Sequence, residues 1–247
     1  MPADASGSEG DFWRDSMKVG TQNETNRNEW VRKTLARIPE GTRILDAGSG
    51  ERQFKKFCSH LEYVAQDFGQ YNGSGDKRGL QTGKWDQSGI DIISDINEIP
   101  APDGSFGAIL CTEVFEHLPN PLAAISEFKR LLKEGGYLIL TAPFCSLTHF
   151  SPYHFFSGFN RYFYETHLTQ NGFQILDIQT NGNFFEYLGQ ETRRIGDVAA
   201  RYTDTLPNFI ERLALRFVLR LLQRLSERDK GSEELLCFGY HVLARKD

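Results

Sequence analysis

Two carboxylates and an imidazole lie close together in residues 113–117, which read EVFEH. They follow an apolar run, 106–111, that is typical of a buried strand. Carboxylate oxygens together with one imidazole suit Mg²⁺, Mn²⁺ or a similar divalent ion. The alternative is that these side chains only support the loop in which they lie. The spacing gives the hypothesis of a metal site formed by Glu113, Glu116 and His117.

Two more histidines, His149 and His154, lie in the aromatic segment 143–156, which reads PFCSLTHFSPYHFF. An unperturbed imidazole titrates near neutral pH, so either histidine could take a proton from an acceptor hydroxyl. Either could instead complete the metal site, or could only form hydrogen bonds within the loop. The segment follows an expected strand, and open α/β sheets bind ligands at the carboxyl ends of their strands. We therefore predict His149 and His154 as the candidate catalytic residues.

A glycine-rich turn follows the first expected strand, in residues 44–50, which read ILDAGSG. Glycines in a tight turn between a strand and a helix let a ligand approach the backbone closely. Asp67 follows about 20 residues later, where a carboxylate can bind ribose hydroxyls. This spacing predicts a nucleotide-like cofactor and fits NAD as well as other adenosine compounds.

Three features distinguish the pattern from an NAD site. First, the glycines follow the pattern DxGxG and not GxGxxG. Second, an acid lies at the end of the third expected strand, in residues 94–96 (SDI). Third, residues 110–118 read LCTEVFEHL. In this order, from Arg43 to Phe144, the chain resembles the class I, Rossmann-like methyltransferases that use S-adenosyl-L-methionine. The resemblance implies that Gly48 and Gly50 face the methionine portion of the cofactor. It also implies that Asp67 binds the ribose and that Asp95 binds the adenine amino group. The implied cofactor residues are Asp46, Gly48, Ser49, Gly50, Asp67, Asp95, Ile96 and Thr112.

The E-x-x-E-H spacing is similar to the metal motif of ubiquinone-biosynthesis O-methyltransferases and of small-RNA 2′-O-methyltransferases. In those families the ion positions an acceptor hydroxyl and lowers its pKa. The resemblance implies methyl transfer to a hydroxyl of a small molecule, sugar or glycan. RNA 2′-O-methylation is the alternative, although a net charge of −5 and the lack of a basic tract disfavour nucleic acid. A catalytically silent, cofactor-binding regulator is the alternative from another class.

The elements that must position these residues alternate between apolar strand-like runs and helical patterns. This alternation predicts an α/β fold with a parallel sheet, and the resemblance implies a doubly wound, mostly parallel sheet of seven strands. We expect a flexible N-terminus, 1–20, a single domain, 21–247, and a helical insertion, 184–230, before the last strand. The expected strands are 43–46, 63–66, 90–93, 106–111, 137–141, 173–178 and 235–243, and the expected helices are 24–37, 51–58, 121–133 and 161–171.

The insertion contains a strongly apolar helix, 207–228, with a basic edge. Three roles are open: packing onto its own domain, covering the site or forming a homodimer, and lying on an anionic membrane surface. Its arginines recur every four residues, which places them along one stripe of the helix. They are Arg212, Arg216, Arg220 and Arg224.

Composition excludes several other classes of protein. Four scattered cysteines give no CxxC pair, so neither a zinc site nor a disulfide framework is indicated. The N-terminal residues lack the basic start and apolar run of a signal peptide, and no stretch has the roughly 18 apolar residues of a membrane span. With 39% hydrophobic and 25% charged residues, the expectation is a globular cytoplasmic protein.

Overall fold

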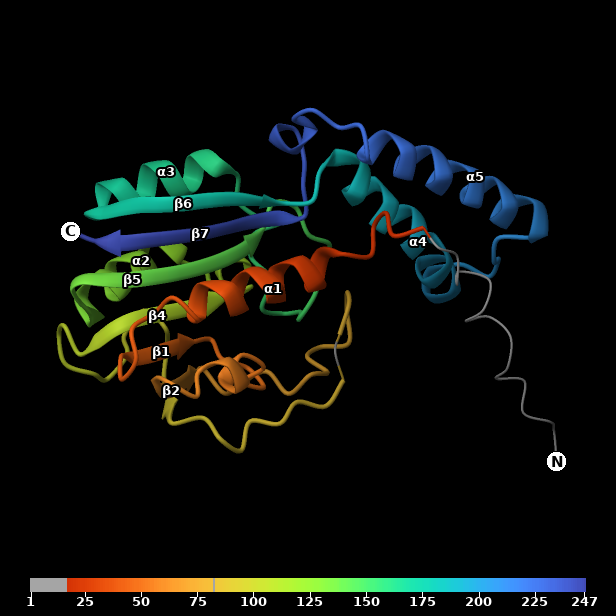
Figure 1. Ribbon diagram of the computed structural model, residues 1–247. Helices are drawn as coiled ribbons and strands as arrows, with labels where there is room; N and C mark the ends of the chain where they lie inside the picture. The colour runs from red at the N-terminus through yellow and green to blue at the C-terminus, as the bar shows by residue number, and fades with distance from the viewer. Residues whose placement is uncertain (1–16, 82) are drawn as a thin grey trace.

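The structure is a computed structural model that describes residues 17–81 and 83–247. One seven-stranded sheet has the order β3-β2-β1-β4-β5-β7-β6 (Figure 1). β7 is antiparallel to both its neighbours and the remaining pairs are parallel. The predicted α/β class and the mostly parallel sheet are therefore confirmed. The strands are β1 (Arg43–Ala47), β2 (Glu62–Asp67), β3 (Ile92–Ile93), β4 (Phe106–Thr112), β5 (Leu132–Pro143), β6 (Phe173–Asn181) and β7 (Gly239–Lys246).

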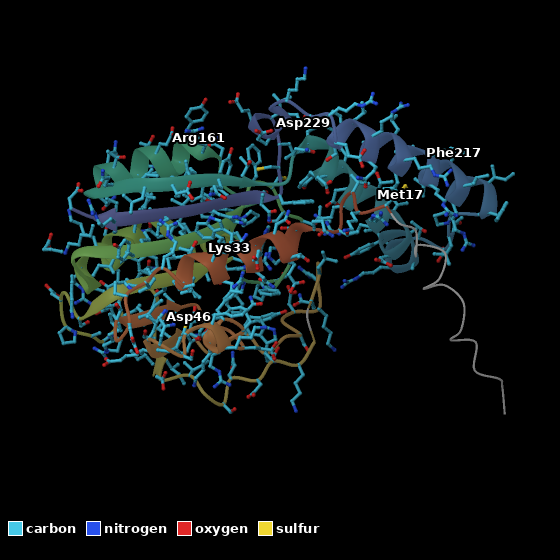
Figure 2. All side chains as sticks on the ribbon, in the orientation of Figure 1. Met17, Lys33, Asp46, Arg161, Phe217 and Asp229 are labelled. Atoms are coloured by element: carbon cyan, nitrogen blue, oxygen red, sulfur yellow. The ribbon has the colours of Figure 1, made fainter. Side chains whose placement is uncertain are left out.

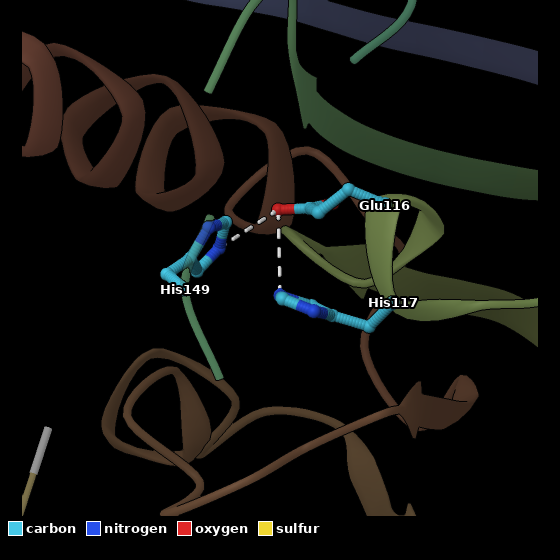
Figure 3. Close-up of side chains that lie close together, drawn as sticks. All are labelled: Glu116, His117 and His149. Carbon is cyan, nitrogen blue, oxygen red and sulfur yellow. Dashed lines mark ion pairs between the residues drawn. The ribbon is translucent and has the colours of Figure 1, made fainter. Parts of the chain in front are cut away.

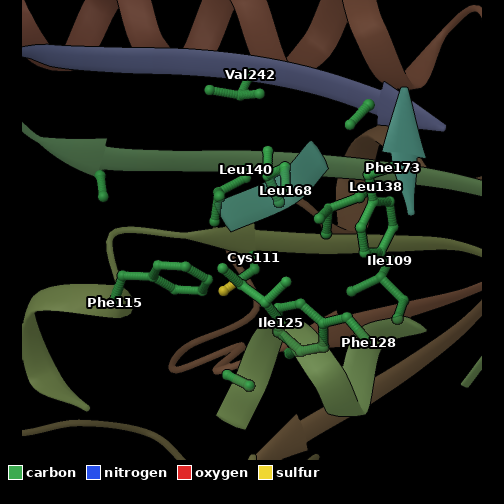
Figure 4. Packing of buried hydrophobic residues seen from close by; sticks show 14 of the residues in the cluster. Ile109, Cys111, Phe115, Ile125, Phe128, Leu138, Leu140, Leu168, Phe173 and Val242 are labelled. Carbon is green, nitrogen blue, oxygen red and sulfur yellow. The ribbon is translucent and has the colours of Figure 1, made fainter. Parts of the chain in front are cut away.

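Helices cover both faces of the sheet, because side chains in the central strands alternate between two cores. In β4, Ile109 and Cys111 belong to the core beneath α2 (Pro121–Leu131) and α3 (Arg161–Gln170) (Figure 4). Ala108 and Leu110 face the opposite core, which α1 (Asn23–Leu35) closes with Trp30, Val31 and Leu35. The two cores fix the strand ends that carry the candidate site.

The largest differences from the expected elements lie after β1, at the start of β5 and in the last strand. No α-helix follows β1: Arg52 has a φ of 58°, which interrupts a helical path, and only the 3₁₀ helix η2 (Lys55–Phe57) forms. The helix expected over 121–133 ends at Leu131, and β5 begins at once because Leu132 pairs with Phe106.

The last strand was expected over 235–243 and is found later, at Gly239–Lys246. Leu235 is exposed and follows the 3₁₀ helix η4 (Ser232–Glu234), so it belongs to the connection before the strand. Its apolar character therefore does not mark a buried strand residue.

The insertion forms two helices, α4 (Phe184–Tyr202) and α5 (Phe209–Ser226), which pack on each other. Figure 1 shows both beyond the carboxyl ends of the parallel strands. Among the described residues, no helix has the length and hydropathy needed to cross a bilayer.

Part of the expected flexible N-terminus is packed against these helices. Val19 is fully buried, and its backbone N–H donates to Gln223 of α5 over 2.7 Å. The N–H of Gly20 donates to Glu186 of α4, also over 2.7 Å. Residues 17–20 are therefore part of the domain, and residues 1–16 lie outside the described residues.

A buried histidine predicts how stability changes with pH. His241 of β7 stacks on Trp30 with 5.0 Å between ring centroids, and burial lowers its pKa from 6.5 to about 4. The folded protein holds His241 in its neutral form, whereas the unfolded chain binds a proton there below about pH 6.5. The contribution of His241 to stability is therefore present above pH 6.5 and is lost as the pH falls towards 4. We expect the loss to be about 2–3 kcal/mol of unfolding free energy. Urea unfolding at pH 7 and pH 4.5 measures this loss. The unfolding free energy of His241→Gln should change less between the two pH values, whereas that of the control His167→Gln, on α3, should change as in the native chain.

Candidate active site

The glycine turn after β1 has the backbone conformation that its sequence requires. Gly48 and Gly50 have φ values of 75° and 50°, in the left-handed region that favours glycine. A Cβ on Gly48 would lie 2.5 Å from Val114 Cγ2, so the glycine is also required by the packing of the loop after β4. Ser49 Oγ is buried and has no hydrogen-bond partner among the described residues. The turn thus offers an unused polar atom to a ligand.

The acid at the end of β2 holds this turn in place. Asp67 is 4% exposed, and its carboxylate accepts hydrogen bonds from the N–H groups of Gly50 (3.0 Å) and Gly69 (2.9 Å). Each carboxylate oxygen can accept more than one hydrogen bond, so capacity for ribose hydroxyls remains. Asp67 therefore lies beside the turn, and its predicted role at the ribose stays a prediction.

Three other predicted cofactor residues, Asp95, Ile96 and Asp46, are held by contacts outside the turn. Asp95 is exposed and accepts a hydrogen bond from the N–H of Asn97, and Ile96 is buried in the main core. Asp46 is buried and accepts a 2.5 Å hydrogen bond from the Tyr63 hydroxyl, and burial raises its pKa to about 7. Asp46 thus packs inside the domain (Figure 2).

A pocket of about 590 Å³ opens between the glycine turn, the end of β4 and the aromatic loop. It brings together residues that are far apart in the sequence. Its walls include Gly48, Ser49, Gly50, Thr112, Glu113, Glu116, His117 and His149 from the predicted set, and Arg27, Trp85, Glu191 and Arg194 from elements that were not predicted to contribute.

Three electron-pair donors converge in this pocket: Glu116, His117 and His149 (Figure 3). Glu116 is 1% exposed, and its Oε1 lies 3.6 Å from His117 Nε2 and 3.7 Å from His149 Nε2. One ligand atom from each residue lies within 4.8 Å of the others. The structure therefore adds His149 to two of the three residues predicted to bind metal.

Hydrogen bonds to backbone carbonyls fix the protons of both imidazoles. His117 Nδ1 lies 2.5 Å from the Tyr153 carbonyl oxygen, and His149 Nδ1 lies 2.8 Å from that of Leu147. Because a carbonyl only accepts, both Nδ1 atoms carry protons, and both Nε2 atoms have lone pairs when the rings are neutral. Those lone pairs face the Glu116 carboxylate, and His117 Nε2 and Glu116 Oε2 are buried without a partner among the described residues. A cation between them would satisfy this arrangement.

The electrostatics of the cluster also favour a positive charge in it. Burial raises the pKa of Glu116, but the neighbouring His149 and His117 lower it by more. Burial lowers the pKa of His149, but the Glu116 carboxylate raises it by more, so the net direction is upward. The pKa of His117 is lowered, mainly by burial. The Glu116 carboxylate therefore stabilises a positive charge on His149, whereas burial disfavours one on His117.

Two predicted site residues lie beside the cluster. Glu113 forms a 3.0 Å ion pair with Arg27 of α1 and accepts a 2.9 Å hydrogen bond from the Thr141 hydroxyl. The Nε2 of His154 lies 3.1 Å from Ser146 Oγ, and its ring centroid is 4.8 Å from that of His149. In this arrangement Glu113 and His154 border the Glu116 cluster, and their predicted roles stay predictions.

Leu80, in the loop connecting β2 and β3, holds His149 in place. The N–H of Leu80 donates to the Thr148 carbonyl (2.9 Å), and the Leu80 carbonyl accepts from the Phe150 N–H (3.0 Å), so the two hydrogen bonds flank His149. Phe150 stacks on His117, with 4.9 Å between ring centroids, and also contacts Trp85. The loop therefore links the glycine turn, which Trp85 covers, to the histidine cluster.

Sequence reasoning missed Arg27, Trp85 and the α4 residues of the pocket. An arginine in a helix before the glycine strand, and a tryptophan in a polar loop, were the available signals. Neither specifies a contact without the path of the chain.

The strand order, the glycine turn after β1 and the acid at the end of β2 together define a class I methyltransferase fold. Residues 21–191 match the family described as methyltransferase domain. The chain therefore belongs to this family.

Curated relatives match parts of the chain. A ubiquinone biosynthesis O-methyltransferase of Xanthomonas axonopodis pv. citri (strain 306) is 31% identical over 118 residues, which cover 47% of this chain and 48% of the relative. The protein of the same name from Dechloromonas aromatica (strain RCB) is 38% identical over 63 residues, 25% of this chain and 26% of that one. The matches thus span about half or less of these relatives.

Solved structures share the fold at low sequence identity. A SAM-dependent methyltransferase from Archaeoglobus fulgidus has a TM-score of 0.51 and 18% identity, with coverage of 91% of this chain and 97% of that one. The cyclase SpnF has a TM-score of 0.55 and 17% identity, with coverage of 95% and 85%. Because one neighbour is named a cyclase, the shared fold does not by itself define the reaction.

Proposed function

We propose that the protein transfers a methyl group from S-adenosyl-L-methionine to a hydroxyl of a small molecule or sugar. The observation that carries this is the convergence of Glu116, His117 and His149 in the pocket that also contains the glycine turn. S-Adenosyl-L-methionine supplies an activated methyl group, so the protein mainly has to align the acceptor and control its proton. A hydroxyl, unlike a neutral amine, needs such control.

The residues of the turn fit the cofactor. Ser49 Oγ is an unused buried donor in the pocket, the glycines keep the turn free of side chains, and the Asp67 carboxylate adjoins it. We assign the methionine portion to Gly48 and Gly50 and the ribose to Asp67. The assignments of Asp95 and Ile96 to adenine rest on the resemblance.

The residues of the cluster fit a divalent cation, with Glu116, His117 and His149 as ligands. The anionic carboxylate offsets part of the ion's charge, and two imidazoles shift the preference from Mg²⁺ towards Mn²⁺, Fe²⁺ or Zn²⁺. These three residues would hold the cation, and the chemistry it would supply there is a lower pKa for a bound hydroxyl. The Tyr153 and Leu147 carbonyls orient the two rings, in the way that outer hydrogen bonds orient metal-binding histidines.

Binding of the cofactor product tests the cofactor assignment. Asp67→Asn replaces one carboxylate oxygen by an NH₂ group that faces a backbone N–H. It also removes the negative charge that would accept hydrogen bonds from the ribose hydroxyls. We expect the affinity for S-adenosylhomocysteine in calorimetry to fall roughly 10–100-fold, the effect of one or two lost charge-assisted hydrogen bonds. Asp197→Asn, an exposed change on α4, is the control. Equal affinities in a folded Asp67→Asn protein would contradict the assignment.

Methyl transfer itself is tested with isotopically labelled cofactor and fractionated small-molecule extracts. Transfer of label to an extract compound, with the methyl carbon bonded to oxygen in its NMR spectrum, is the expected result. Label on nitrogen, or on total RNA supplied in a parallel reaction, would assign a different acceptor, and cofactor binding without transfer would indicate a regulatory protein.

A further inference from the structure

The outward face of α5 is apolar although it points away from the domain. The inner face, with Leu219 and Leu222, is buried against Val19 and α4. On the opposite side Ile210 is 75% exposed, Phe209 70% and Phe217 58%. The other exposed large apolar side chains of α5 are Leu213 and Leu221 on the same side, and Val218 and Leu225 at its border with Leu222, and we call these seven residues the outer face. Packing onto the domain therefore accounts for only one side of α5.

Position in the molecule makes this face accessible. α5 lies beyond the carboxyl edge of the sheet (Figure 1), and Figure 2 shows Phe217 in the middle of this helix, away from the sheet. An exposed apolar patch of this kind on a globular domain marks an interaction surface.

Charge is distributed unevenly around the outer face. α5 carries four arginines and one glutamate, Glu211, although the chain as a whole has a net charge of −5. Arg220 and Arg224 are both exposed and share the helical turns of Phe217 and Leu221. The Arg220 guanidinium lies 5.8 Å from the centre of the Phe217 ring. Glu211 is engaged in capping, because its carboxylate accepts a hydrogen bond from the Asn208 N–H.

A second copy of the chain fits this surface poorly. A two-fold dimer places the same patch against itself, so Arg220 and Arg224 would approach the arginines of the partner, with one acidic residue in the helix to compensate. An anionic lipid surface offers acyl chains to the apolar side chains and phosphates to the guanidinium groups at the same time.

We propose that the outer face of α5 binds the surface of anionic phospholipid membranes, with Phe209, Ile210 and Phe217 inserted and Arg220 and Arg224 at the headgroups. α4 lies behind this face and contributes Gln190, Glu191 and Arg194 to the pocket. A membrane-bound molecule would therefore hold its pocket close to the bilayer. The proposal does not depend on methyl transfer, because it concerns a different surface.

Vesicle sedimentation with the full chain tests the proposal, with vesicles of phosphatidylcholine alone and with about one third phosphatidylglycerol. We expect binding to the anionic vesicles that weakens with salt. Ile210→Ser combined with Phe217→Ser should lower the partition coefficient roughly tenfold or more, because it removes two inserted side chains. Arg220→Gln combined with Arg224→Gln should lower it about tenfold on anionic vesicles and little on neutral ones. All four residues are exposed, so thermal unfolding should stay unchanged.

Tyr162→Ser on α3, where the tyrosine is 73% exposed, is the matched control and should bind like the native chain. Failure to sediment with anionic vesicles, or equal binding by the serine double variant, would overturn the proposal. A dimer in ultracentrifugation that Phe217→Ser dissociates would assign the face to a second copy.

Discussion

Replacement of Glu116 by glutamine is expected to lower methyl transfer at least about 100-fold and to remove the response to added metal. The change keeps the shape of a buried side chain but removes the charge that both histidine Nε2 atoms face. Loss of an outer hydrogen bond at a metal site costs 10–100-fold, so loss of a ligand should cost more. Turnover with labelled cofactor, and calorimetric titration of Mn²⁺ into the protein, measure the two effects.

Metal removal is the companion experiment on the native chain. Dialysis against EDTA should abolish most turnover, and Mn²⁺ or Mg²⁺ should restore it. Glu134→Gln serves as the control variant because Glu134 is an exposed residue of β5 that pairs with Lys246. If turnover is indifferent to EDTA and Glu116→Gln still loses activity, the cluster acts through protons and not through a metal ion.

Replacement of His149 by alanine is expected to lower turnover about 10²-fold or more while the affinity for S-adenosylhomocysteine stays nearly constant. This is the usual size of effect for a group that controls a proton of the acceptor, and a metal ligand should have at least that effect. The geometry selects His149 over His154, because His149 Nε2 faces Glu116 whereas the hydrogen bond of His154 Nε2 is to Ser146. His154→Ala should therefore have the smaller effect.

The metal and the base interpretations of His149 predict different second measurements. A ligand role predicts that His149→Ala weakens Mn²⁺ binding, whereas a base role predicts loss of the acidic limb of the pH profile with metal binding unchanged. His167→Ala on α3, outside the pocket, is the control. Full turnover in both His149→Ala and His154→Ala would contradict the proposed role of the aromatic loop.

Local patterns were enough to predict the central strands and the glycine turn. Short continuous apolar runs indicate the middle of β1, β2, β4 and β5, because each of these strands faces a core on both sides. Residues 51–58 show the limit of such patterns: their composition allows a helix, but Arg52 turns towards the loop and its guanidinium lies 3.7 Å from Asp86. That contact depends on a segment more than 30 residues away.

The sequence was enough to identify most residues of the cluster but not the contacts between them. Both halves of the cluster, E-x-x-E-H and His149, were identified from residue type and spacing, and their closeness to the expected strand ends was inferred. The selection of His149 as the partner of Glu116, and of Arg27 as the partner of Glu113, results from backbone hydrogen bonds to Leu80 and from the position of α1. These are tertiary contacts that a single sequence does not encode in any local pattern.

The place of β7 has a consequence for synthesis of the chain. β5 and β6 do not pair with each other; each pairs with β7, whose residues follow the whole α4–α5 segment. Until residues 239–246 have left the ribosome, β5 and β6 each lack their shared neighbour and keep an open edge, and open edges are sites of aggregation. The sheet becomes continuous only when residues 239–246 are inserted between strands that were made earlier. Emergence of residues 239–246, and not translation of the glycine turn, is therefore the step that completes the sheet, and a nascent chain stalled within α5 should be protease-sensitive at β6.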